Sequence, residues 1–282
     1  MEQKEIRFKE KRELGIIISD SFEFLKQEYK SVSKLVFIYV LPFVLLYAAV
    51  QVWFQRNILS GIDMSDQEIL LANIGPFYMN LFVLMLFNLF VQSLLAGTFY
   101  SYVEAYINKG KDKFETPEIT SRFFANSLLA LGANLAFFII VMFGIIFCIV
   151  PGIYLANTLS LVVIAFIYEK KGLSDALSRS WKLVTRQWWN TFILNILGFL
   201  MVYAIGLILS IPSMLFGFGN TVIGSPDTTT VEYPDWYWIL TGITAVITTI
   251  LLVIPFTFQA FQYFNLSERE KPTIQIDPDS VL

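Results

Sequence analysis

The sequence contains no histidine and only one cysteine, Cys148, and these two shortages exclude several kinds of chemistry. Without histidine there is no Ser-His-Asp or Cys-His arrangement, no histidine proton relay and no metal site that contains histidine. One cysteine cannot form an intrachain disulfide or a thiolate cluster, and Cys148 lies in an apolar run, where a free cysteine behaves as a small hydrophobe. We therefore assign no catalytic residue, no metal ligand and no cofactor.

Charge is also scarce, since only 15% of the residues are charged and the formal net charge is -3. A surface that binds nucleic acid needs a concentrated basic patch, so nucleic acid is not an expected partner. Hydrophobic residues, in contrast, make up 56% of the 282 residues, and the mean hydropathy is +0.61. Soluble domains are about 45–50% apolar even with glycine included. The composition therefore predicts a membrane protein.

Six apolar stretches are long enough to cross a bilayer, whose hydrocarbon core of about 30 Å requires roughly 20 helical residues. We predict an all-α polytopic membrane bundle with six transmembrane helices, at 34–55, 78–106, 127–150, 152–168, 191–216 and 236–264. Only Pro151-Gly152 separates the third from the fourth, which indicates a tight turn and an antiparallel hairpin. Residues 1–270 are expected to form this single membrane domain, and 271–282 a flexible cytoplasmic tail.

The basic residues occupy alternate gaps between these helices. Every lysine and arginine except Arg56 lies before the first, after the second, after the fourth or after the last apolar stretch. The other gaps carry acidic residues such as Asp63 and Asp235, and Arg56 at a helix end can snorkel to the interface. Because positive charge accumulates on the cytoplasmic side, we predict a multi-pass protein of the inner, cytoplasmic membrane with both termini in the cytoplasm.

Two amphipathic helices are predicted at the cytoplasmic interface, at 8–32 and 172–190. Adding 159 to the positions of the first apolar stripe gives those of the second. The first stripe is Leu14, Ile18, Phe22, Leu25, Tyr29 and Val32, and the second is Leu173, Leu177, Trp181, Val184, Trp188 and Thr191. The same offset superposes the first two membrane helices on the last two. We therefore predict a pseudo-repeat, an amphipathic helix followed by two membrane helices, on either side of a central hairpin.

The second amphipathic helix leaves two interpretations open. Its aromatic and basic residues are typical of an interface helix that recognises anionic lipid or a cytoplasmic partner. The alternative is a structural elbow that packs on the bundle. The residues in question are Trp181, Trp188, Trp189, Arg179, Lys182 and Arg186.

Polar residues inside the apolar stretches are few, and no ionisable residue lies near the middle of the bilayer, so a proton-coupled pump is not expected. Asn88 and Asn134 lie well inside their helices and are the best candidates to line a cavity. Amides in membrane helices also serve as hydrogen-bond partners between helices, which is the competing interpretation.

Small residues recur at every fourth position in two of the helices and predict close helix packing, within the chain or between copies of it. The first series is Ser93, Gly97 and Ser101, and the second is Gly152, Ala156 and Ser160. The pattern does not distinguish the two arrangements, so the oligomeric state stays open.

Three short segments resemble a known group of bacterial membrane proteins. They are Pro151-Gly152-Ile153-Tyr154-Leu155-Ala156, the run from Asp175 to Val184 followed by Trp188-Trp189, and the closing Tyr263-Phe264-Asn265-Leu266-Ser267-Glu268-Arg269 with Asn265 where an Asp is usual. In these segments the chain is similar to families related to the membrane domain of glycerophosphoryl diester phosphodiesterase. The resemblance implies a six-helix membrane domain of largely uncharacterised role. It does not imply phosphodiesterase activity, which belongs to a separate soluble domain that uses histidine and metal-binding acids.

Three classes of function fit these observations. The first is a membrane protein without catalytic activity, a scaffold or accessory factor that presents its interface helices to membrane lipid or to another membrane or cytoplasmic protein. The second is a facilitator of a small neutral or amphiphilic molecule, favoured by the repeated halves and by prolines inside helices. The third is a lipid-modifying enzyme with a metal site at Asp63, Asp66 and Glu68, although a solvated acidic loop explains these residues better.

Overall fold

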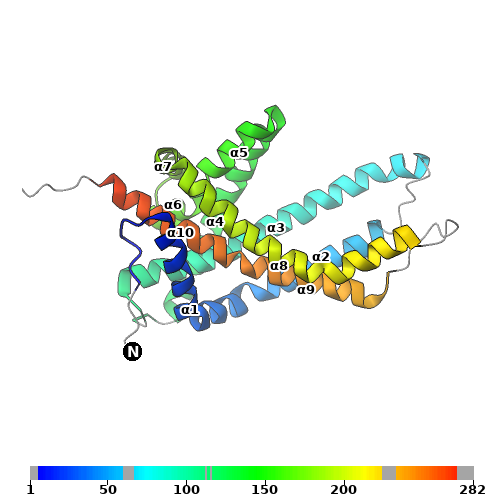
Figure 1. Ribbon diagram of the computed structural model, residues 1–282, viewed down its shortest axis with the longest axis horizontal. Coiled ribbons are helices and arrows are strands. Elements are labelled where there is room, and N and C mark those ends of the chain that lie inside the picture. Colours follow the sequence, from blue (N-terminus) through cyan, green and yellow to red (C-terminus); the bar gives the residue numbers. More distant parts are fainter. Residues whose placement is uncertain (1–5, 60–66, 112, 115, 224–232, 272–282) are drawn as a thin grey trace, which may run out of the picture.

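The computed structural model describes residues 6–59, 67–111, 113–114, 116–223 and 233–271 (Figure 1). Over these ranges the chain is helical and forms no strand. The helices are α1 (Leu14–Tyr39), α2 (Leu41–Phe54), the short π-helix η1 (Gln55–Leu59), α3 (Gln67–Lys109), α4 (Thr116–Phe147), α5 (Ile149–Thr158), α6 (Val162–Glu169), α7 (Leu173–Arg186), α8 (Trp188–Ile223), α9 (Asp235–Leu251) and α10 (Val253–Glu270).

Five stretches of helix are long and apolar enough to cross a membrane, which confirms the predicted all-α class. They are Ile74–Lys109, Ile119–Phe147, Ile149–Glu169, Trp188–Phe218 and Asp235–Glu270. A sixth is counted if α1 and α2, which meet at an angle of 58°, form one broken crossing. The expected tail at 271–282 lies outside the described residues except for Lys271.

The first crossing differs from the expected straight helix over 34–55. Helix α1 continues from Leu14 to Tyr39, and the chain bends at Val40 before α2 begins. Pro42 lies in the first turn of α2, and a proline ring removes one backbone hydrogen bond and clashes with the carbonyl four residues earlier. The helix therefore breaks just before Pro42, and the expected interface helix and the start of the first membrane helix are one continuous element.

The hairpin between the third and fourth crossings turns at Cys148, where the backbone is extended with φ -173° and ψ 149°. The sequence placed this turn at Pro151-Gly152, but proline is accepted in the first turn of a helix, and Pro151 lies in the first turn of α5. At Gly152 an added Cβ would come within 3.0 Å of the Ile145 backbone nitrogen. The missing side chain therefore allows α4 and α5 to approach closely.

The core lies where α1, α6, α7 and α10 gather around one end of α3 (Figure 1). Phe24, Phe258 and Phe261 are fully buried there. Phe8, which precedes α1, stacks on Phe261 with ring centroids 4.3 Å apart and meets Phe24 edge to face at 5.0 Å. We call this region, which contains both described chain ends, the terminal end of the bundle, and the opposite end with Arg56 and Asp235 the far end.

Burial in α1 and α7 follows the 159-residue offset, on a face that overlaps the predicted stripe but is rotated from it, since Val32 and Val184 of the stripe are buried. In α1 the predicted stripe residues Phe22 and Tyr29 are 37% and 57% exposed. The buried positions Ile17, Ser21 and Phe24 correspond at this offset to Ala176, Ser180 and Leu183, which are also buried. In a membrane protein apolar side chains are free to face lipid, while small and polar ones specify contacts between helices. Hydrophobicity alone therefore did not identify the packed face.

Candidate ligand-binding cavity

A cavity of about 480 Å³ lies among α3, α4, the broken helix pair α5 and α6, α8 and α10. Its walls are largely apolar, with side chains such as Phe137, Phe192 and Phe256. None of the described residues that line it is charged. Its polar lining residues are Gln92, Tyr100, Asn134, Asn157, Ser160, Asn195, Tyr203 and Gln259.

A chain of hydrogen bonds crosses one wall of the cavity and joins four helices. The Tyr100 hydroxyl of α3 donates to Gln259 Oε1 of α10 over 3.2 Å, and Gln259 Nε2 donates to Asn195 Oδ1 of α8, also over 3.2 Å. Asn195 Nδ2 donates to Asn157 Oδ1 of α5 at 2.9 Å, and Asn157 Nδ2 donates to the Trp188 carbonyl at 3.0 Å. Such a connected network holds each amide in a defined orientation beside the cavity.

The structure separates the two asparagines that the sequence singled out. Asn134 lines the cavity, and its Nδ2 donates to Ser93 Oγ of α3 over 2.9 Å. Asn88 does not line it, but accepts a hydrogen bond from the cavity-lining Gln92. Gln259 was missed. It lies 159 positions after Tyr100, to which it is bonded, but a repeat offset relates equivalent positions and does not by itself indicate a contact.

The two predicted packing series occupy different places. Gly97 faces α4 so closely that an added Cβ would lie 2.5 Å from the Ser127 Cα, and Ser101 accepts a hydrogen bond from Asn126 at 2.8 Å. Ser93 also bonds to α4, through Asn134, and Gly152 contacts Ile145. These four residues therefore lie at contacts within the chain. Ala156 and Ser160 line the cavity instead.

Ser160 is the lining residue with an unused polar group. Its Oγ is buried, and no hydrogen bond to it is found among the described residues. Buried hydroxyl groups nearly always have a partner. A ligand with a hydrogen-bonding group would supply one at this position.

Helix α7 is tied to its neighbours through its basic residues. Arg179 Nε lies 2.8 Å from Glu169 Oε1, and Arg179 also pairs with Glu270, which Lys182 reaches at 2.6 Å. Burial by itself would lower the pKa of the Arg179 guanidinium, but hydrogen bonds to Glu270 and Glu169 outweigh burial and raise the pKa. These ion pairs hold α7 against the ends of α6 and α10.

The three tryptophans of this region have different surroundings. Trp188 stacks on Tyr154 with centroids 5.7 Å apart and donates from Nε1 to Thr158 Oγ1 at 3.2 Å. Trp181 and Trp189 are 43% and 69% exposed. Trp188 therefore belongs to the packed elbow between α7 and α8, and the other two present apolar rings to the surroundings.

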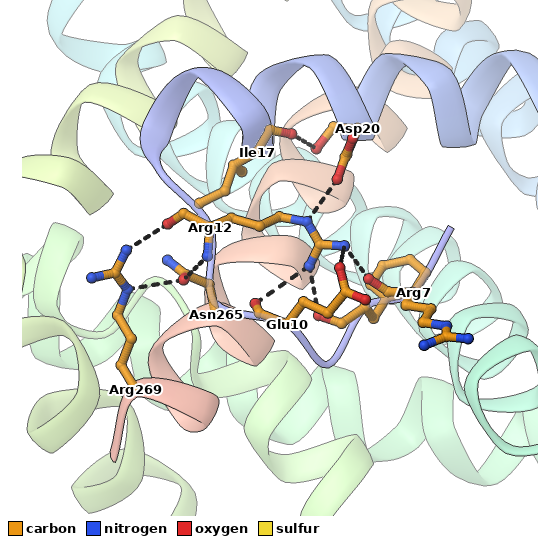
Figure 2. A network of polar contacts seen from close by, with 9 residues as sticks. Arg7, Glu10, Arg12, Ile17, Asp20, Asn265 and Arg269 are labelled. Atoms are coloured by element: carbon orange, nitrogen blue, oxygen red, sulfur yellow. Dashed lines mark hydrogen bonds and ion pairs between the residues drawn. The ribbon is translucent and has the colours of Figure 1, made fainter. Parts of the chain in front are cut away.

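Residues 6–13 form a non-helical strap, although 8–13 were predicted to be part of the first amphipathic helix. The strap is fastened to the end of α10, as Figure 2 shows. Asn265 Oδ1 accepts hydrogen bonds from the Arg12 backbone N–H at 2.8 Å and from Arg269 Nε at 3.0 Å, while Arg269 Nη2 donates to the Arg12 carbonyl at 2.6 Å. The buried Phe8 ring explains why the strap leaves the helix direction and lies against the core.

Metal-ligand clusters are absent from the described part of the chain, where no three His, Cys, Asp or Glu residues gather. Asp63 and Asp66, the first members of the alternative metal site, lie outside the described residues, and the side chain of Glu68 is not described either.

No curated protein and no solved structure matches the chain. A family model does match over residues 70–266, which include the cavity. The chain therefore belongs to the family described as domain of unknown function DUF7847.

Proposed function

We propose that this chain is a multi-pass protein of the bacterial cytoplasmic membrane that binds one neutral or amphiphilic molecule in the cavity between the α4–α5 hairpin and α8, without catalytic activity of its own. The observation that carries this proposal is the apolar cavity with its wall of bonded amides and the unpartnered Ser160 hydroxyl. Ligand sites in proteins are mostly apolar pockets of about 300–1,000 Å³ with a few well-placed polar groups.

The rim of the cavity favours a ligand that arrives from the lipid. Ile153 of α5 and Ile196, Leu200 and Tyr203 of α8 line the cavity and are between 46% and 69% exposed. Apolar side chains exposed on a membrane-length helix face hydrocarbon. A molecule with an apolar chain can therefore lie along this rim while its polar group reaches the amides inside. Uncharged walls favour a neutral polar group over an ion.

Our first choice is that the chain binds the amphiphile without transporting it. In this role the protein is a scaffold or accessory factor that contacts membrane lipid or another protein. A facilitator is the second candidate, and the breaks between α5 and α6 and between α9 and α10 favour it. The first break, at Leu159–Leu161, supplies Leu159 and Ser160 to the cavity lining, and the second, at Leu252, precedes the lining residue Phe256 by one helical turn. Interrupted helices are the usual elements of transport sites.

Orientation is part of the same proposal, with both termini in the cytoplasm. The positions of the basic residues between the predicted membrane helices support it. The strap supports it too, because the hydrogen bond from Arg269 to the Arg12 carbonyl brings both ends of the described chain to one end of the bundle. We also propose kinship with the membrane domain of glycerophosphoryl diester phosphodiesterase, without its catalysis. Reporter fusions at Met1 and Leu282 are expected to place both in the cytoplasm, and opposite compartments would contradict the topology.

The cavity is tested by filling its mouth. Leu200→Trp enlarges a rim residue, whereas Ile208→Trp makes the same change two turns further along α8 at a residue that is 64% exposed and outside the cavity. The full-length variants are purified in mild detergent, and co-purified small molecules are identified by native mass spectrometry. We expect one bound amphiphile in the wild type and in Ile208→Trp, and its loss in Leu200→Trp.

A second variant guards against an indirect effect at the rim. Ala156→Phe fills the cavity from α5, whereas Leu200→Trp fills it from α8. Retention of the same molecule by both Leu200→Trp and Ala156→Phe, with unchanged thermal stability, would show that the cavity is not its site.

A further inference from the structure

A second pocket, of about 320 Å³, lies at the terminal end of the bundle and is separate from the cavity lined by Asn134, Asn157 and Asn195, which we call the amide cavity. Three elements form it: the strap, the last turn of α7 and the last turns of α10. Its lining residues are Lys11, Leu183, Arg186, Gln187, Leu266, Arg269 and Glu270. No motif in the sequence had brought the three cations together, because they lie far apart along the chain.

The pocket carries positive charge that the protein does not neutralise. Lys11, Arg186 and Arg269 form no ion pair with any carboxylate among the described residues. The single acid in the lining, Glu270, is already paired with Arg179 and Lys182. The three side chains are exposed, whereas the buried Arg12 at the same end is paired with Asp20 at 2.7 Å. The pocket therefore presents three exposed cations to an anion from outside the chain.

One of the three cations has a fixed position. Arg269 is held by Asn265 and by the Arg12 carbonyl, which leave further guanidinium donors free for a ligand (Figure 2). The backbone at Lys11 is adjacent to Arg12, whose side chain is only 3% exposed and is bonded to the strap and to Asp20, while the Lys11 side chain itself is exposed. An anion would thus find the Arg269 donors already oriented, which reduces the entropy cost of binding.

The pocket lies beside the ends of two membrane-length helices. Arg186 and Gln187 directly precede Trp188, where a membrane-length helix begins, and Arg269 lies in the last turn of another. Trp189 and Trp181 expose their rings beside this junction. Tryptophan is enriched at the headgroup level of membranes, so the cations face the region in which lipid phosphates lie.

We propose that this pocket binds the phosphate of an anionic phospholipid headgroup from the adjoining leaflet. Arginine and lysine recognise phosphate by charge-assisted hydrogen bonds, and basic pockets between helices on the cytoplasmic side are suited to anionic lipid headgroups. The inference rests on the proposed topology of the termini but not on the occupant of the amide cavity.

The test compares two lipids that differ only in charge. Full-length protein in mild detergent is titrated with phosphatidylglycerol or phosphatidylcholine of the same acyl chains, and bound lipid is counted by native mass spectrometry. We expect the wild type to prefer phosphatidylglycerol, and the double variant Lys11→Gln/Arg186→Gln to bind it roughly 30-fold more weakly, as two interfacial charges predict. Arg269 is left intact because it also fastens the strap.

The matched control removes the same amount of charge elsewhere on the terminal end. Lys26→Gln/Lys30→Gln alters two exposed lysines of α1, and Lys26 is 80% exposed. Isolated exposed charges are screened at physiological salt, so this variant is expected to lose less than about 3-fold. Equal loss in both double variants would overturn the site, as would equal binding of the two lipids by the wild type.

Two further measurements separate the remaining explanations. Displacement of phosphatidylglycerol by millimolar inorganic phosphate would mean a site for a soluble anion and would overturn the lipid assignment. Leu200→Trp, which blocks the amide cavity, is expected to keep the preference for phosphatidylglycerol. If it abolished that preference, the lipid would lie in the cavity and not at Lys11 and Arg186.

Discussion

The two ends of the bundle are built differently. At the terminal end aromatic side chains are enclosed, as with Phe99 and Phe258, which are 1% and 0% exposed. At the far end Phe82 of α3 and Phe218 of α8 are 51% and 70% exposed. The far end has one described ion pair between helices, Arg56 with Asp235 at 3.3 Å, whereas the terminal end is crossed by many.

This difference shows where the fold is specified. Lipid tails are as apolar as phenylalanine, so exposed rings at the far end cost little in a membrane, and helices are held together by close packing and polar contacts. Such contacts concentrate at the terminal end and at the inner part of the α3–α4 contact, where Gly97 meets Ser127. Beside the amide cavity, α5 is tied to α8 by the hydrogen bonds of Asn157 with the Trp188 carbonyl and with Asn195.

The largest effect is expected from Gly97→Leu. An added Cβ would lie 2.5 Å from the Cα and 2.6 Å from the backbone nitrogen of Ser127, so α3 and α4 must separate. Overpacking costs about 1–3 kcal/mol and more where backbone cannot move, so we expect little folded protein by size-exclusion chromatography in detergent. Gly132→Leu is the control, because nothing lies within 4 Å of its added Cβ. Similar yields of the two variants would contradict the close α3–α4 contact.

Phe8→Ala is expected to release the strap. The ring is 2% exposed and contacts Phe24, Phe261 and Phe264. Truncation of a buried phenylalanine costs about 3 kcal/mol or more, which is enough to expose residues 6–12 to limited proteolysis. Phe218→Ala at the far end removes an equally large ring that is 70% exposed, and it is expected to leave proteolysis and the unfolding free energy unchanged. Equal protection of the strap from proteolysis in both variants would contradict the proposed difference between the terminal end and the far end.

A smaller loss is expected from Tyr102→Phe. The Tyr102 hydroxyl donates to the buried carboxylate of Glu28, which Lys111 approaches at 3.6 Å. Removal of a hydrogen bond to a buried charged group costs about 2 kcal/mol, measured as the free energy of unfolding in a denaturing detergent. Tyr203→Phe is the control, since Tyr203 is 69% exposed. A change below that of the control would mean that Lys111 alone satisfies Glu28.

Hydropathy predicted the class of fold because membrane-length apolar runs can be recognised without knowledge of tertiary contacts. The helix ends at Val40 and Cys148 were each placed several residues away from their observed positions. A proline such as Pro42 or Pro151 is compatible with several positions in a first helical turn, so it indicates that a break is near but does not locate it.

The candidate sites were less accessible to prediction. Asn134 was identified because an amide in an apolar helix is conspicuous, but its neighbour in the cavity wall, Gln259, is distinguished only by its contacts. The charged residues of the strap resembled the polar face of a helix, so the sequence predicted a helix there. The buried ring of Phe8 instead holds the strap against the core. The basic pocket depends on the contact between the two chain ends, which no local pattern encodes.

The smallest effect is expected from Arg56→Gln at the far end. This change removes the ion pair with Asp235, but the two side chains are 56% and 80% exposed, and exposed pairs contribute about 1 kcal/mol or less. The apolar groove beside the pair, between α2 and α9, is lined by Ala48 and Gly242, and packing there does not depend on the charge. We therefore expect an unfolding free energy close to that of the wild type. The difference between the two free energies is expected to stay the same when the salt concentration is raised. A loss as large as that of Tyr102→Phe would show that the far end is held by this pair, and the contrast between the two ends would not stand.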